Sequence, residues 1–486
     1  MNKKMVAYTL GRLLQIEAVL LAIPLIVSLL YREPLRYAAS FLVIALLTGG
    51  IGYMFTKKIP RIKTFYAKEG FVIVSLSWIL LSFFGALPFV LNGDIPSLVD
   101  AFFETASGFT TTGASILTDV EALAHSSLFW RSFTHLIGGM GVLVFALAVL
   151  PQMESETVHI MKAEVPGPTF GKIVSRISHS ARILYYMYLI FTAVVIVLLI
   201  IAGMPVFDSF IHAFGAAGTG GFGMKNGSIA PYDSVWIEVI LGAGMLVFGT
   251  NFNLYFLIFT RHIKEALKSE ELKWYLGFIT GAIALITMQL TFSSETYHNG
   301  LEALRHSFFS VISLMTTTGF STDNFNNWPL FSQMILILLM FVGGMAGSTG
   351  GGMKVSRIVI LIKTAFSELK RNAYPNRIVS MHFEDKPVEG GMIKAIANYL
   401  IVYVGIFVLL LLIISFQLDD FTSAFTTVAA TLNNIGPGLG MVGPDSSYAF
   451  FNPFNKLILS ITMIMGRLEI FPILILFSPG IWRKRA

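Results

Sequence analysis

The sequence has no cysteine among its 486 residues, and only 13% of the residues are charged. The absence of cysteine excludes disulfides, thiol nucleophiles and zinc–thiolate sites. The low charged fraction excludes an ordinary soluble domain, in which about a quarter of the residues carry charge. HExxH and GxSxG patterns are also absent, so the usual signatures of a membrane protease are missing, and we predict no catalytic residues.

Apolar residues make up 55% of the chain, and the mean hydropathy is +0.73. A membrane-spanning helix needs roughly 20 mostly apolar residues. Runs that suit this length lie near residues 6–30, 38–55, 70–91, 126–150, 183–204, 235–260, 271–292, 330–365, 393–416 and 453–481. The first run is too long for a signal peptide and lacks a small-residue cleavage site, so we expect it to be retained. The sequence therefore predicts an all-α integral membrane protein with about ten spans.

Basic residues gather in alternate connections between these runs. They include Lys57, Lys58, Arg61, Lys63, Lys68, Lys162, Lys172, Arg176, Arg182, Arg261, Lys264, Lys268, Lys273 and Arg483-Lys484-Arg485. Residues 92–125 and 417–453 have no lysine or arginine. The positive-inside rule then predicts that both termini are cytoplasmic, with Arg32 and Arg36 as an exception in an outer loop. Membrane topology thus explains the net charge of +6, and we expect the lipid bilayer, not nucleic acid, as the surroundings.

The four long outer connections align without gaps on one glycine each. These glycines are Gly113, Gly221, Gly319 and Gly436, preceded by Thr110-Thr111-Thr112, Gly218-Thr219-Gly220, Thr316-Thr317-Thr318 and Asn433-Asn434-Ile435. Eleven positions before each glycine stands a phenylalanine: Phe102, Phe210, Phe308 and Phe425. Two positions earlier, Asp100, Asp208 and Ser423 suit the N-cap of a helix. A single TTTG is common in turns, but four loops in register indicate an internal repeat.

The repeat unit is a span, a pore helix, a filter strand and a second span. The sequence predicts an N-terminal helix pair at 1–69, followed by pore repeats at 70–182, 183–270, 271–392 and 393–486. The four repeats are expected to surround one pore, and the third is expected to contain an intramembrane gating loop.

Glycine-centred loops of this kind suit a selectivity filter for potassium. A filter replaces the hydration shell of the ion with oxygens, and backbone carbonyls do so without net charge. Glycine reaches the positive φ that such a backbone needs at little cost, and the threonines can add a hydroxyl ligand. A pore helix that ends at the filter presents the negative end of its dipole to the cation. We therefore predict potassium binding at the sixteen loop residues named above, with potassium as the substrate and the only metal, and no cofactor.

Over essentially its whole length the chain resembles the TrkH/TrkG-type potassium uptake proteins of the Trk/Ktr/HKT superfamily, including the two extra N-terminal spans. The resemblance implies a fold related to tetrameric potassium channels and potassium uptake across the bacterial cytoplasmic membrane. It also implies a homodimer and a cytoplasmic ring of TrkA-type regulatory subunits that bind nucleotides. In plant relatives, serine in place of the first filter glycine accompanies sodium selectivity. Gly113 is glycine here, which favours potassium.

The run after the third filter contains six glycines in ten residues: Gly343, Gly344, Gly347, Gly350, Gly351 and Gly352. Each glycine costs a helix about 1 kcal/mol relative to alanine. We expect an unwound intramembrane gating loop here, as the resemblance also implies, although small residues can instead serve close helix packing. Gly138-Gly139-Met140-Gly141 of the first repeat requires only such packing.

Arg467 lies just past the middle of the last run, where a charge costs roughly 2.5–3.5 kcal/mol to insert. Glu469 lies on another face of that helix and cannot neutralise it. The alternative to a role in conduction is a structural ion pair with another span. We expect Arg467 to face the pore below the filter and to raise the barrier for the ion, and the resemblance implies the same.

Two further readings stay open at this stage. Lys363, Lys370, Arg371 and Arg377 form a basic cytoplasmic face, which either only sets topology or docks an acidic regulatory ring. A secondary carrier that couples potassium to protons or sodium is the alternative function, with Glu104 and Glu469 as the residues that could couple. Carriers usually show two-fold repeats and titratable groups at mid-membrane, so four repeats favour conduction.

Overall fold

The computed structural model describes residues 1–60, 67–141, 177–292, 297, 299–376 and 380–479. Within these residues the only strands are β1 (His382–Phe383) and β2 (Lys386–Pro387), which pair antiparallel. In the part of the chain that the structure describes, six helices are long and apolar enough to cross a membrane, and a seventh span results if one sharply bent pair is counted. The predicted all-α membrane fold is thus confirmed. The basic segments at Arg61 and Lys63, 162–176, Arg377 and 483–485 lie outside the described residues.

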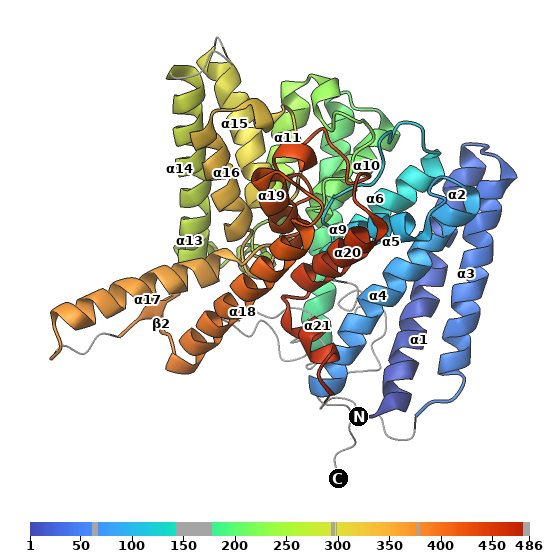
Figure 1. Cartoon of the computed structure of the whole chain (residues 1–486), viewed down its shortest axis with the longest axis horizontal. Helices are drawn as coiled ribbons and strands as arrows, with labels where there is room; N and C mark the ends of the chain where they lie inside the picture. The colour runs from blue at the N-terminus through green and yellow to red at the C-terminus, as the bar shows by residue number, and fades with distance from the viewer. Residues whose placement is uncertain (61–66, 142–176, 293–296, 298, 377–379, 480–486) are drawn as a thin grey trace.

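Three helices precede the repeats and form the blue edge of the molecule in Figure 1. α1 (Lys3–Leu20) leads directly into α2 (Ala22–Leu30), and α3 (Leu35–Thr56) packs along α1. Gly11 and Gly52 face each other where α1 meets α3. A Cβ on Gly52 would lie 2.7 Å from the Gly11 carbonyl oxygen, so only small residues allow this approach.

Four units with the same order of helices follow. The first has α4 (Ala67–Asn92), α5 (Leu98–Phe109) and α6 (His125–Gly139). The second has α9 (Ile177–Ile201), α10 (Val206–Gly218), α11 (Val235–Phe248), α12 (Phe252–Phe259) and α13 (Ile263–Lys268). The third has α14 (Glu270–Phe292), α15 (Gly300–Met315), α16 (Leu330–Val342) and α17 (Val355–Ala373), and the fourth has α18 (Gly390–Ile414), α19 (Phe421–Leu432), α20 (Pro453–Arg467) and α21 (Phe471–Leu476). Short 3-10 turns at Ala230–Tyr232, Phe325–Asn327 and Gly440–Val442 shape the outer connections.

The short helices α5, α10, α15 and α19 are the expected pore helices, but they begin earlier than the sequence suggested. Their N-cap residues are Ser97, Pro205, Asn299 and Asp420. Asp100, Asp208 and Ser423 therefore lie within the first turn and are not N-caps. The N-cap prediction was wrong because these side chains fit the first turn equally well. There an acidic group still favours the helix dipole.

The helix that follows each filter loop is short, with 13 to 15 residues. α6 ends at Gly139, α11 at Phe248, α16 at Val342 and α20 at Arg467. After its end α11 turns by 91° into α12, and α20 is followed by the short α21. The predicted runs 235–260 and 453–481 are thus not continuous helices, whereas the predicted break in 330–365 is present.

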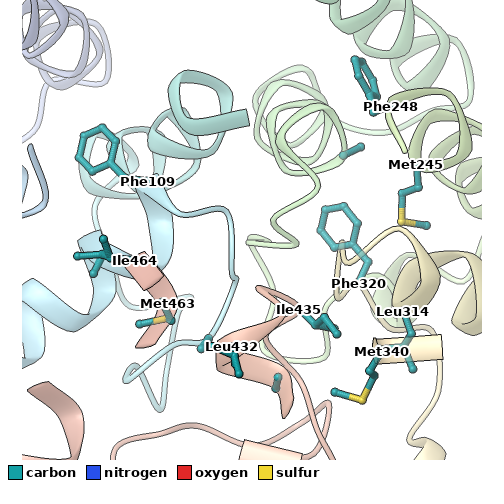
Figure 2. Packing of buried hydrophobic residues seen from close by; sticks show 14 of the residues in the cluster. Phe109, Met245, Phe248, Leu314, Phe320, Met340, Leu432, Ile435, Met463 and Ile464 are labelled. Carbon is teal, nitrogen blue, oxygen red and sulfur yellow. The ribbon is translucent and has the colours of Figure 1, made fainter. Parts of the chain in front are cut away.

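Apolar side chains from all four repeats pack behind the loops that follow the pore helices. Figure 2 shows Phe109 of α5, Met245 of α11, Leu314 of α15 and Leu432 of α19 among them. Each of these side chains is buried. This packing keeps the ends of the pore helices fixed around a common centre.

Candidate functional site

The four loops that follow the pore helices share one backbone conformation. The aligned glycines have positive φ angles: 81° at Gly113, 75° at Gly221, 84° at Gly319 and 92° at Gly436. The residue two positions earlier is also left-handed in every loop: 53° at Thr111, 56° at Thr219, 61° at Thr317 and 56° at Asn434. For a residue with a side chain this conformation costs about 1–2 kcal/mol. The same strain at four aligned positions shows that the loops are structural equivalents.

Left-handed residues follow right-handed ones within each loop. Thr110, Thr316 and Asn433, which cap the pore helices, have φ between −97° and −76° and ψ near zero. When right-handed and left-handed backbone conformations alternate, successive peptide groups point the same way, so the N–H groups share one side and the carbonyls the other. Such a strand can present a column of oxygens to an ion.

The loops meet as a closed ring in chain order. A Cβ placed on any filter glycine would strike the carbonyl oxygen just before the glycine of the next loop. From the added Cβ to the carbonyl oxygen, the distances are 2.0 Å from Gly113 to Gly220, 2.2 Å from Gly221 to Thr318, 2.1 Å from Gly319 to Ile435 and 2.7 Å from Gly436 back to Thr112. The four glycines are therefore required both by φ and by the approach of neighbouring backbone.

Side chains of the loops bind the loops themselves. In the first and third loops the two outer threonine hydroxyls lie 2.8 Å apart, between Thr110 and Thr112 and between Thr316 and Thr318. In the fourth loop Asn433 accepts a hydrogen bond from the Tyr403 hydroxyl (2.9 Å). Asn434 donates to Thr112 Oγ1 (2.9 Å) and so joins the fourth loop to the first. The threonine pairs thus stabilise single loops, whereas Asn434 links the fourth loop to the first.

A cavity of about 320 Å³ opens at the outer side of the ring. All four filter glycines line it, together with Arg131, Lys225 and Asp445 among other residues. Burial raises the pKa of Asp445, and the nearby charge of Asp323 adds to this while a hydrogen bond with Asn324 opposes it. The cavity thus adjoins all four filter glycines on one face of the ring.

A buried ion pair supports the first filter loop from behind. Arg131 of α6 lies 2.5 Å from Glu104 of α5, and both side chains are inaccessible to solvent or nearly so. Glu104 also accepts hydrogen bonds from the Ser115 hydroxyl and the Ile116 amide (2.9 Å each), just after Gly113. The Arg131 guanidinium lies 3.4 Å from the centre of the Phe222 ring, which follows Gly221. This pair therefore fixes the strands that leave the first two filter loops.

Removing one member of this pair should destabilise the protein strongly. Arg131→Met leaves the Glu104 carboxylate buried and uncompensated, which typically costs about 3–5 kcal/mol. The double variant Arg131→Met/Glu104→Gln removes that charge while Gln can still accept the Ile116 amide. We expect the thermal unfolding midpoint of the purified protein to fall in the single variant and to recover partly in the double variant. A single variant as stable as the double one would contradict this role.

The loop after α16, where the sequence predicts a gate, is not helical. Residues between Val342 and Val355 are not helical, and Gly343, Gly347 and Gly352 have φ of 74°, 76° and 74°. The Gly351 amide donates to Thr317 Oγ1 (2.6 Å), and the Gly352 amide donates to the Asn433 carbonyl (3.2 Å). A Cβ on Gly351 would lie 2.3 Å from that same carbonyl oxygen. The loop thus lies directly against the inner ends of the third and fourth filter loops.

The same loop is also bound to the break between α11 and α12. Thr349 donates through its hydroxyl to the Phe248 carbonyl (3.0 Å), and Met345 donates through its amide to the Gly249 carbonyl (3.0 Å). The remaining glycines of the predicted gate, Gly344 and Gly350, are buried within this contact. The broken second helix of the second repeat therefore accommodates the loop of the third.

Arg467 ends α20 beneath the ring. Its guanidinium donates to Thr111 Oγ1 (3.1 Å) of the first filter loop and to the Thr349 carbonyl (2.7 Å) of the gating loop. It also donates to the carbonyls of Gly138 (2.7 Å) and Gly139 (2.6 Å), which end α6. One cation of the fourth repeat thus connects the filter loop and α6 of the first repeat with the gating loop of the third.

Glu469 does not pair with Arg467. Its carboxylate forms a buried ion pair with Arg357 of α17, whose guanidinium lies 4.4 Å from the centre of the Tyr399 ring. Glu469 and the next residue, Ile470, both have positive φ, at 54° and 71°. The pair holds the break after α20 against the helix that follows the gating loop.

The sequence reasoning missed three features of the site. It missed the left-handed residue two positions before each filter glycine, the breaks after α11 and α20, and the Glu104–Arg131 pair. The breaks could have been predicted from Gly249-Thr250-Asn251 and from Gly466, because glycine and asparagine weaken a helix. Arg131, a lone arginine in an apolar run, could have been treated as Arg467 was.

Comparison with known proteins gives a consistent result. The model of the TrkH family, described as cation transport protein, matches residues 36–484. The chain is 37% identical to the Trk system potassium uptake protein TrkH of Salmonella typhimurium over the full length of both. It is 32% identical to TrkG of Escherichia coli K12, with 99% of each chain covered.

A solved structure also matches over the whole chain. The crystal structure of the potassium transporter TrkH from Vibrio parahaemolyticus superposes with a TM-score of 0.89 at 33% identity. The match covers 99% of this chain and 100% of the other.

Proposed function

Because this chain belongs to the TrkH family of cation transport proteins, we propose that it takes up potassium across the cytoplasmic membrane through a gated, channel-like pore. The observation that carries the proposal is the closed ring of four loops with two left-handed residues each. Carbonyl oxygens from these loops would bind potassium in place of water. No chemical catalysis is needed for this function.

The filter comprises the four loops at 110–113, 218–221, 316–319 and 433–436. The gate comprises the glycine-rich loop at 343–352 together with Arg467. Support for the gate comes from the hydrogen bonds of Gly351 and Arg467 to threonine hydroxyls of the filter (2.6 and 3.1 Å). An ion that leaves the filter on the inner side must pass this loop and the guanidinium.

The surroundings of the two acidic residues that could couple potassium to protons favour conduction over a coupled carrier. Glu104 and Glu469 each form a buried ion pair with an arginine, Arg131 and Arg357. A carboxylate in such a pair is a poor proton carrier, because protonation would leave the arginine buried without its partner. Arginine itself stays charged at physiological pH.

Single-channel recording in planar bilayers tests the proposal. Unitary potassium currents in the purified protein would support a pore. A fixed stoichiometry of potassium with protons or sodium, without unitary currents, would instead establish a carrier that performs symport.

We further propose a homodimer that binds a ring of TrkA-type nucleotide-binding subunits at its cytoplasmic face. The exposed basic side of α17, with Lys370 and Arg371, faces away from the buried core and suits an acidic partner. Both chain termini would lie on that side. Light scattering of the purified protein with and without such a subunit would measure the stoichiometry.

A further inference from the structure

One carboxylate oxygen binds both the gating loop and the start of α17, the helix that follows it. Glu271 Oε1 accepts a hydrogen bond from the Ala346 amide (2.8 Å) and another from the Ser356 amide (3.1 Å). Glu271 is the second residue of α14 and is only 5% exposed. It therefore reaches the loop from a helix 75 residues away in the sequence.

Ser356 lies in the first turn of α17, where helix amides have no partner within the helix. The local sequence provides no substitute, since the N-cap residue Lys354 makes no side-chain capping bond and has a left-handed φ of 75°. The Glu271 carboxylate takes this place and also meets the positive end of the helix dipole. Displacing Glu271 would free the start of α17 and the first half of the loop together.

The position of Glu271 is set in turn by the hairpin of β1 and β2. Glu384, in the two-residue turn of that hairpin, accepts hydrogen bonds from the Ser269 hydroxyl (2.8 Å) and from the Glu271 amide (3.0 Å). It thereby caps α14 from outside. Phe383 anchors the hairpin with 1% exposure.

α17 connects the gating loop to the same hairpin. Lys363 of α17 pairs with Glu270 of α14 and donates to the His382 carbonyl (2.9 Å). Figure 1 shows β2 beside α17, in the lower half of the view. The hairpin, the start of α14 and the gating loop thus form one continuous set of contacts.

We propose that Glu271 is a positioning residue that holds the gating loop beneath the filter, and that the β1–β2 hairpin controls it through Glu384. The inference rests on the proposed gated pore. A displacement of the hairpin would shift the first turn of α14 and so withdraw the oxygen that binds the gating loop and the start of α17. Glu271 acts on the loop and not on the ion.

The absence of native cysteine permits a direct test. Ser348→Cys places a single thiol in the gating loop, and its labelling rate by a small thiol reagent reports loop mobility. Adding Glu271→Ala should raise this rate and the potassium flux into liposomes severalfold, while the potassium-to-sodium ratio stays unchanged. Glu271→Gln keeps one acceptor oxygen and should restore most of the wild-type behaviour. Glu384→Ala should act in the same direction, and combining it with Glu271→Ala should add nothing.

The control variants are Glu265→Ala on exposed α13 and Asp385→Asn next to Glu384. Both should leave the labelling rate and the potassium flux unchanged. Monodisperse elution of each variant establishes folding. Unchanged labelling and flux in folded Glu271→Ala would overturn the inference, and so would full additivity with Glu384→Ala. If instead the wild-type protein itself carried no potassium, the proposed function would fail, and labelling of Ser348→Cys would still test the contact.

Discussion

The Gly113→Ser substitution is expected to remove most of the discrimination between potassium and sodium. The serine Cβ would lie 2.0 Å from the Gly220 carbonyl oxygen, so one of the two backbones must move. The φ of 81° at Gly113 adds strain for any residue with a side chain. A moved carbonyl alters one coordinating layer, and a change of about 1.4 kcal/mol in relative binding is a tenfold change in selectivity. Paired flux measurements of both ions in liposomes give this ratio.

Gly93 provides a matched control for the strain alone. Its φ is 87°, almost that of Gly113, but no atom lies within 4 Å of a Cβ placed there. Gly93→Ser should therefore cost some stability and leave selectivity intact. Equal loss of selectivity in both variants would show that strain anywhere in the chain, and not the ring contact, is responsible. Unchanged selectivity in Gly113→Ser would remove the basis for the filter assignment.

The four repeats could be predicted because each carries a phenylalanine and a glycine at the same spacing. The glycines at 113, 221, 319 and 436 are required by a backbone geometry that recurs in each repeat, and a phenylalanine recurs eleven positions before each of them. The break between α16 and α17 could be predicted because six glycines in ten residues oppose a helix. In each case the signal is local in the sequence.

Features set by contacts between distant residues could not be predicted. Thr111 and Thr317 are β-branched and disfavour positive φ, yet the surrounding ring holds them there. Ile470 is left-handed at the break after α20 without any local preference, next to Glu469 that pairs with Arg357. Glu271 is an ordinary first-turn residue of α14 by sequence, and only the fold brings it to the gating loop.

Replacing Arg467 by alanine is expected to raise potassium flux severalfold. The guanidinium places a positive charge beneath the filter, and its hydrogen bonds to neutral oxygens leave that net charge in place to repel a potassium ion that moves inward. The same side chain donates to Thr111 and to the Thr349 carbonyl, so its removal also loosens the gating loop from the first filter loop. Flux into liposomes at matched protein density measures the effect. Arg371→Ala, on the exposed end of α17, is the control for losing a cation.

Arg467→Lys separates the charge from the hydrogen bonds. Lysine keeps the positive charge but lacks the planar fork that lets arginine bind Thr111, Thr349 and the end of α6 together. If the electrostatic barrier dominates, Arg467→Lys should stay close to the wild-type flux while Arg467→Ala is high. If the tether to the gating loop dominates, both variants should conduct alike. A clearly lower flux in folded Arg467→Ala would contradict either role, because each assigns Arg467 to hold conduction back.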